Sequence, residues 1–146
     1  SNSVGPVKID FLTRVDYAKN LMVLEQHEGL EVKTGNCRSY KEASSRLYGN
    51  KDAEGVYSVP GNFKEVRIFS YESSKQPNMT FYGSENGVDY EKIKFDVAEY
   101  KNNENNYDYL VPRKYVATNT NQSQIKYIKF KSSDAINIVR VELEYK

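Results

Sequence analysis

The chain has 146 residues, a length typical of one domain with a single hydrophobic core. Its 21 Lys and Arg residues nearly balance its 20 Asp and Glu residues, so the net charge is +1. This charge creates no field that would attract nucleic acid or anionic lipid, and no apolar run is long enough to cross a membrane. We therefore expect neither nucleic acid nor a membrane as a partner. Tyrosine is abundant, with 13 Tyr and no Trp, which suits half-exposed sheet faces and binding surfaces.

The two ends and the single cysteine constrain the domain organisation. Residues 1–5 open with Ser1-Asn2-Ser3, which is typical of a tag scar or linker, and residues 6–146 are expected to form one domain. Cys37 is the only cysteine, so the chain forms no internal disulfide. We therefore expect the hydrophobic core, together with any bound ion, to stabilise the fold.

Short strands are predicted from the beginning of the chain. Residues 7–11 alternate and residues 21–24 are a short apolar run, so both are predicted strands. Residues 38–46 show little periodicity and predict a loop with one helical turn at 40–43, followed by a turn at 49–52. A strand at 55–59 then ends in the turn signal Pro60-Gly61.

The next two predictions concern a long strand and a hairpin. In the strand predicted at 63–71, Arg67, Phe69 and Tyr71 share one face because side chains two apart point the same way. Residues 79–82 and 90–93 flank Asn86-Gly87, a pair that favours a tight hairpin turn.

The last third of the chain predicts four more strands after the polar loop at 101–106. They lie at 107–111, 115–117, 125–130 and 138–145. In the last strand Val139, Val141, Leu143 and Tyr145 alternate with charged residues and are expected on one buried face. Short strands at this spacing predict an all-β antiparallel β-sandwich, with the first and last strands paired or close together.

Four segments carry a resemblance to a known group of domains. They read VRIFSY at 66–71, MTFYGSENGVDYEKI at 79–93, IKYIKF at 125–130 and RVELEY at 140–145. They resemble the galactose-binding-like jelly rolls, which include discoidin-type domains and carbohydrate-binding modules of bacterial glycoside hydrolases. The chain departs from the group in lacking the Trp that many polysaccharide-binding members use and the cysteine pair of classical discoidin domains.

The resemblance implies a function and a location as well as a fold. Such modules hold a polysaccharide or oligosaccharide without catalysis, and they are tethered to other domains of secreted or cell-surface bacterial proteins. It also implies a structural Ca²⁺ where the first and last strands meet, for which Asp10 and Glu142 match the early and late acidic positions.

No catalytic constellation accompanies these motifs. His27 is the only histidine and is expected at the surface, and Cys37 is expected to be a structural or incidental thiol. Carboxylates are plentiful, but a sequence does not give the separation that a glycosidase pair requires. The chain is therefore not expected to be an enzyme by itself.

Tyrosines beside polar residues are the candidate ligand site, because sugar rings pack on aromatic planes while their hydroxyl groups need polar partners. The predicted ligand-binding residues are Arg67, Tyr71, Tyr107, Tyr109, Arg113 and Tyr115. The alternative is that these tyrosines face the core. Two functions stay open, a carbohydrate-binding module and a structural or interaction module without a sugar site, and in either case we expect a monomer.

Overall fold

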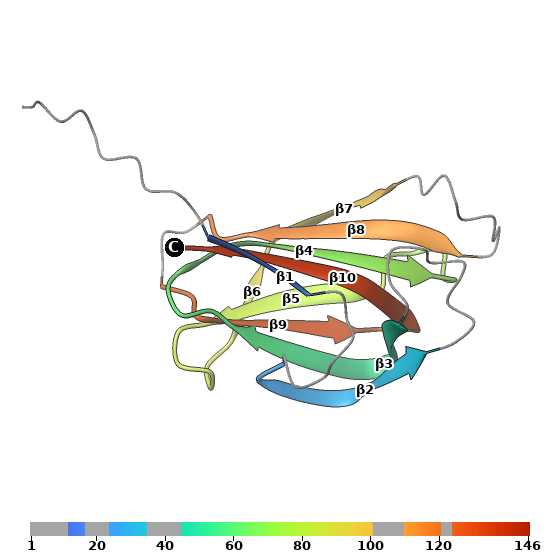
Figure 1. Ribbon diagram of the computed structural model, residues 1–146, viewed down its shortest axis with the longest axis horizontal. Helices are drawn as coiled ribbons and strands as arrows, with labels where there is room; N and C mark the ends of the chain where they lie inside the picture. The colour runs from blue at the N-terminus through green and yellow to red at the C-terminus, as the bar shows by residue number, and fades with distance from the viewer. Residues whose placement is uncertain (1–11, 17–23, 35–44, 101–109, 121–123) are drawn as a thin grey trace, which may run out of the picture.

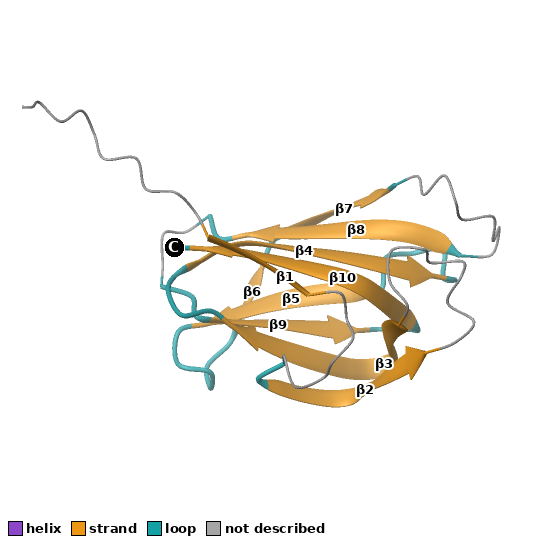
Figure 2. Ribbon diagram, in the orientation of Figure 1, coloured by secondary structure: helices purple, strands orange, loops and turns teal. Residues whose placement is uncertain are grey.

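The computed structural model describes residues 12–16, 24–34, 45–100, 110–120 and 124–146, which form strands and loops (Figure 2). The strands are β1 (Leu12–Asp16), β2 (Gln26–Thr34), β3 (Ser45–Ser58), β4 (Phe63–Glu72), β5 (Met79–Ser84), β6 (Glu91–Ile93), β7 (Phe95–Glu99), β8 (Val111–Thr118), β9 (Tyr127–Ser132) and β10 (Ile136–Tyr145). Every pairing between them is antiparallel. Within the described residues, no helix is long and apolar enough to cross a membrane.

The strands form two layers (Figure 1). The upper layer has the order β7-β8-β4-β10-β1, and the lower layer has the order β6-β5-β9-β3-β2. The start of β10 also pairs with β3, through residues 136–138 opposite 47–49, so hydrogen bonding continues from one layer to the other. The fold is thus an antiparallel, jelly-roll-like sandwich, and the predicted fold class is confirmed.

Aromatic rings join the two layers in the core. Phe81 on β5 lies 5.3 Å from Phe95 on β7 and 5.9 Å from Tyr115 on β8, measured between ring centroids. Leu47, Ile68 and the other core residues pack around them, and Phe81 and Tyr115 are fully buried. Burial of side chains of this size contributes roughly 1.5–3 kcal/mol each.

Several predicted elements are confirmed. The strand at 63–71 corresponds to β4, and the segments at 79–82 and 90–93 pair as the β5–β6 hairpin. The first described strand, β1, pairs with the last, β10. The segments at 7–11 and 40–43, and most of 21–24, lie outside the described residues.

Two local predictions are wrong. The turn predicted at 49–52 is an irregularity inside β3, where Asp52 has a φ of 66° and the pairing with β2 jumps between Leu30 and Glu28. In β10 a bulge between Ile138 and Arg140 interrupts the alternation. Val139 consequently joins a small cluster with Phe69 and Tyr71 on the outer face of the upper layer, whereas Val141 and Leu143 face the core.

Candidate functional site

Two of the predicted ligand tyrosines are interior residues. Tyr71 and Tyr115 both have an exposed fraction of 0%. Tyr71 lies on the outer face of the upper layer as predicted, but Tyr100 and Leu110 pack over it. Tyr115 points into the core between the layers. The prediction that these two rings form an exposed sugar-stacking surface is wrong, since other side chains already cover them.

Arg113 is also an interior residue, and it organises the loop between β4 and β5. Its Nη1 lies 2.8 Å from Glu72 Oε1 and donates to the Gln76 carbonyl. Its Nη2 donates to the carbonyls of Ser74 and Lys75. The guanidinium of Arg113 thus holds the loop in place, and its Nη1 and Nη2 donors are engaged within the protein.

Tyr115 completes this buried network. Its hydroxyl donates to Glu72 Oε1 at 2.7 Å and accepts from the Asn78 backbone N–H at 2.7 Å. Burial, together with the negative charge of Glu72, raises the pKa of the Tyr115 phenol well above its ordinary value. The phenol is therefore a neutral structural hydrogen-bond donor.

Arg67 is paired with three carboxylates on the outer face of the upper layer. It donates to Glu142 Oε1 at 2.7 Å, to Glu144 Oε2 at 3.1 Å, and to Glu65. Burial lowers the pKa of the Arg67 guanidinium, but the hydrogen bonds to these carboxylates outweigh that effect and raise it. The predicted role of Arg67 as a ligand donor has no support in this arrangement, because its Nε and Nη1 donors are engaged within the protein.

The remaining predicted site residues do not assemble into a site. Tyr107, Tyr109 and Asp10 lie outside the described residues. Glu142 is paired with Arg67, and its Oε2 lies 3.4 Å from Arg140 Nε. Within the described ranges no group of three or more His, Cys, Asp or Glu residues is arranged to hold a metal ion. With two arginines beside it, Glu142 does not fit as a calcium ligand in this arrangement, and calcium binding stays a prediction.

The outer face of the lower layer carries a different set of tyrosines. Tyr82 on β5 and Tyr127 on β9 point away from the core, because their neighbours Phe81 and Ile128 point into it. Both rings are half-buried, as is the ring of Tyr90, which follows the β5–β6 loop. We call Tyr82, Tyr90, Tyr127 and the adjacent Lys129 the tyrosine face.

The β5–β6 loop is ordered by side-chain hydrogen bonds that fix the position of Tyr90. Asn86 Oδ1 accepts from the backbone N–H groups of Val88 at 2.8 Å and Asp89 at 2.9 Å. Ser84 Oγ accepts from the Gly87 N–H, and Gly87 has a φ of 79°, which glycine adopts readily. A Cβ at Gly87 would lie 3.2 Å from the Tyr127 ring, so the loop packs directly against the tyrosine face.

Lys129 connects the rings of the tyrosine face. Its Nζ lies 4.0 Å from the centroid of the Tyr90 ring, a cation–π contact. Tyr82 is its direct partner on β5. Burial, the neighbouring Tyr127 and the charge of Glu54 raise the pKa of the Tyr90 phenol, so its hydroxyl is protonated and can donate a hydrogen bond at neutral pH.

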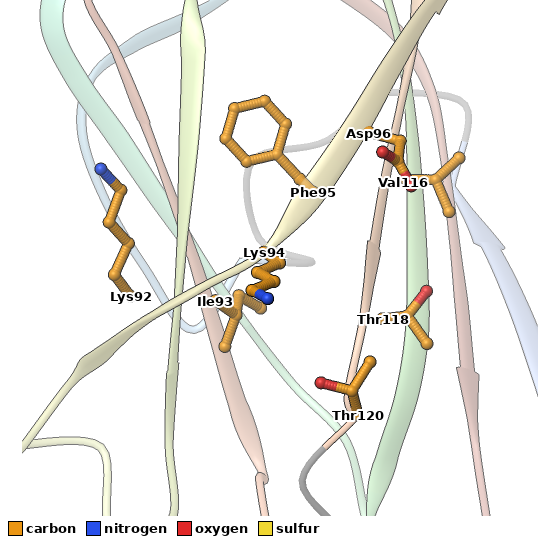
Figure 3. A pocket seen from close by; sticks show the side chains of 8 residues that line it. All are labelled: Lys92, Ile93, Lys94, Phe95, Asp96, Val116, Thr118 and Thr120. Atoms are coloured by element: carbon orange, nitrogen blue, oxygen red, sulfur yellow. The ribbon is translucent and has the colours of Figure 1, made fainter.

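A hollow of about 570 Å³ lies between the β6–β7 crossover and the end of β8 (Figure 3). It is lined by Lys92, Ile93, Lys94, Phe95, Asp96, Val116, Thr118 and Thr120. Its one aromatic ring, Phe95, packs against Phe81 and Tyr115 of the core. The hollow therefore offers hydroxyl and charged groups to a ligand but no free ring on which a sugar could stack.

A second hollow lies at the β2 edge of the lower layer and contains His27. Its lining includes Glu25, Glu28 and Glu54, and its volume is about 510 Å³. His27 is exposed, which confirms its expected place at the surface.

The sequence contained a signal for the tyrosine face. In 79–84, Met79 and Phe81 alternate with Thr80 and Tyr82, which places Tyr82 on the polar face of the strand. The same pattern applies to Tyr127 and Lys129 in IKYIKF. None of the predicted ligand-binding residues lies on these polar faces.

Comparison with known proteins shows similarity of fold. No protein-family model matches the chain, and no curated protein matches it in sequence. A mutant of a family 29 carbohydrate-binding module superposes with a TM-score of 0.54 at 10% identity, covering 92% of each chain. Another family 29 module, in complex with cellulohexaose, has a TM-score of 0.54 at 9% identity, covering 94% of this chain and 93% of the other. A different mutant of that same module, in complex with mannohexaose, has a TM-score of 0.52 at 10% identity and covers 93% of each chain. The chain therefore has the fold of the carbohydrate-binding modules.

Proposed function

We propose that this protein is a noncatalytic carbohydrate-binding module that binds a polysaccharide or oligosaccharide through the tyrosine face. The observation that carries the proposal is that Tyr82, Tyr90 and Tyr127 lie half-exposed together on one sheet of this fold, with Tyr90 held by an ordered loop. Aromatic rings of this kind pack against the C–H faces of sugars, and their hydroxyl groups serve as polar partners at the edge.

The fold likeness supports the same proposal. Two of the similar structures are modules solved with cellulohexaose and with mannohexaose. By extension, the module belongs to a secreted or cell-surface bacterial protein, where it is tethered to a glycoside hydrolase and raises the local concentration of that enzyme on its substrate. The implied partner is a glycan chain, and the module itself is a monomer.

The competing function, a structural module without a sugar site, predicts a surface without an exposed aromatic cluster. The tyrosine face favours binding over that alternative.

Affinity electrophoresis in gels containing xylan, glucomannan, galactan or β-glucan tests the proposal. We expect retardation by at least one polymer, and a protein that migrates freely through a broad panel of gels would favour the structural module.

Variants locate the site once a glycan is found. Tyr82→Ala and Tyr90→Ala should each weaken binding about three- to tenfold, because an aromatic stacking contact contributes about 0.5–1.5 kcal/mol. Tyr48→Ala is the matched control. Tyr48 is also half-buried and carries a lysine, with Lys33 Nζ at 3.7 Å from its ring centroid, but it lies outside the tyrosine face. Equal losses in all three variants would show that the tyrosine face is not the site.

A further inference from the structure

Two lysines flank Tyr82, and within the described residues neither of them forms an ion pair. Strand register places Lys92 on β6 and Lys129 on β9 directly beside Tyr82 on β5, one on each side of the ring. Adjacent strands are about 4.8 Å apart, so the two lysines are separated by about 10 Å with the tyrosine between them.

The row of directly paired residues that contains Tyr82 has no carboxylate among its described members. Beyond Lys129 the row continues with Val56 on β3 and Gln26 on β2. Across the ranges that the structure describes, neither Lys92 nor Lys129 forms an ion pair. Each ammonium group is therefore left without a direct carboxylate partner, although the charge of Glu54 acts on the Tyr90 ring that Lys129 contacts.

The charge of a comparable lysine elsewhere on the lower layer is balanced by a carboxylate. Lys33, which lies over the ring of Tyr48, has Glu31 Oε1 at 3.6 Å from its Nζ. Lys131, the next outward lysine on β9, is the direct partner of Glu54 on β3. Lys92 and Lys129, by contrast, have no carboxylate directly opposite them in the strand register.

Lys129 is also held in place. Its ammonium group lies over the Tyr90 ring, and Tyr90 is fixed by the ordered β5–β6 loop. A cation fixed in this way loses less conformational entropy when an anion binds than a freely rotating lysine does. Two ammonium groups that flank a stacking ring match a sugar chain whose rings carry negative groups at intervals.

We infer that the tyrosine face selects an anionic polysaccharide, one whose sugar rings carry carboxylate or sulfate groups, and that Lys92 and Lys129 bind these groups on either side of a ring stacked on Tyr82. This inference rests on the proposed function. Carboxylate and sulfate are both anions that accept hydrogen bonds from an ammonium group. The test therefore includes one polymer of each kind.

The test is isothermal titration calorimetry of the whole chain with polygalacturonate, a sulfated galactan and a neutral galactan, at about 0.02 M and about 0.5 M NaCl. We expect one of the two anionic polymers to bind at least about tenfold more tightly than the neutral one at low salt, with most of that difference lost at high salt. The polymer that binds more tightly identifies the anionic group.

Variants separate charge from stacking. Lys92→Met and Lys129→Met retain the aliphatic stem and should each weaken anionic binding about three- to fivefold, a larger factor than either variant has on binding of the neutral galactan. Lys129→Arg should restore binding. Lys75→Met, a substitution of an exposed lysine in the β4–β5 loop, is the matched control and should have no effect.

The outcomes that overturn the inference differ from those that overturn the proposed function. If a neutral glycan binds at least as tightly as the anionic ones and salt has no effect, the inference is wrong and the proposed function stands. If anionic binding is equally weakened by Lys75→Met, the charge at Tyr82 is not the determinant and the inference is also wrong. If no glycan binds, neutral or anionic, both are wrong.

Discussion

Arg113 and Glu72 form an ion pair inside the protein, with 2.8 Å between Nη1 and Oε1 and side-chain exposed fractions of 4% and 0%. The pair fixes the β4–β5 loop, since the same guanidinium binds three loop carbonyls. A residue predicted from the sequence to contact a sugar thus has a structural role, and its removal should affect folding before it affects binding.

The Arg113→Met variant should lower the free energy of unfolding by about 3–5 kcal/mol, because it leaves the Glu72 carboxylate buried without its cation. Urea denaturation followed by fluorescence measures the loss. The double variant Arg113→Met/Glu72→Leu should recover part of it, since no charge then stays buried. If the double variant is less stable by the sum of the two single losses, the two residues are not coupled.

Tyr115 should make stability depend on pH in the alkaline range. The pKa of its phenol is raised in the folded state, so the unfolded chain loses this proton at lower pH than the folded protein does. Its contribution is complete below the ordinary tyrosine pKa of about 10 and is lost as pH rises above that value, by up to about 1.4 kcal/mol per pH unit.

The Tyr115→Phe variant provides the measurement. It should be less stable than the native sequence at pH 7 by about 1–3 kcal/mol, because the Asn78 N–H loses its acceptor and Glu72 loses a donor. Between pH 9 and pH 11 its stability should fall less steeply. Parallel pH curves for the two proteins would contradict the role assigned to this phenol. Glycan binding should be unchanged, because Tyr115 is buried.

Gly87→Ala tests the loop that holds Tyr90. The substitution puts a side chain at a φ of 79° and a Cβ 3.2 Å from the Tyr127 ring. We expect a loss of about 1–2 kcal/mol in stability, measured by thermal unfolding, and weaker glycan binding because Tyr90 moves. Glu85→Ala, in the same loop but exposed, is the control and should change neither. Normal binding by a destabilised Gly87→Ala protein would show that the position of Tyr90 does not matter.

Calcium is tested by comparing melting curves in EDTA and in millimolar CaCl₂. A Ca²⁺ held by Asp10 and Glu142 would raise the melting temperature in CaCl₂, because a ligand that binds only the folded state stabilises it. Asp10→Asn would abolish that increase. Superimposable curves would remove the calcium prediction and leave Glu142 as a partner of Arg67 and Arg140.

The sequence predicted strands and turns better than it predicted which faces are exposed. Alternation in 63–71 correctly separated Tyr71 from Val66 and Ile68, since the two sets lie on opposite faces of β4. It did not show that Tyr100 and Leu110 would cover Tyr71, because both come from segments distant in sequence. Burial of an outer face depends on such long-range packing, which a local pattern does not contain.

The same reason explains the errors at Arg113 and Val139. A polar residue beside tyrosines is typical of a sugar site, but Arg113 binds carbonyls of a loop about 40 residues earlier in the chain. The bulge at Val139 depends on the pairing of β10 with β4, which no feature of β10 alone reveals. By contrast, the alternation around Tyr82 and Tyr127 correctly gives their outward direction, and both rings stay half-buried rather than covered.

The bulge in β10 ties two hydrophobic clusters to one strand, with Val139 in the outer cluster and Ile138 and Val141 in the main core. Detachment of this strand would expose both clusters to water at the same time. We therefore expect the two clusters to unfold together.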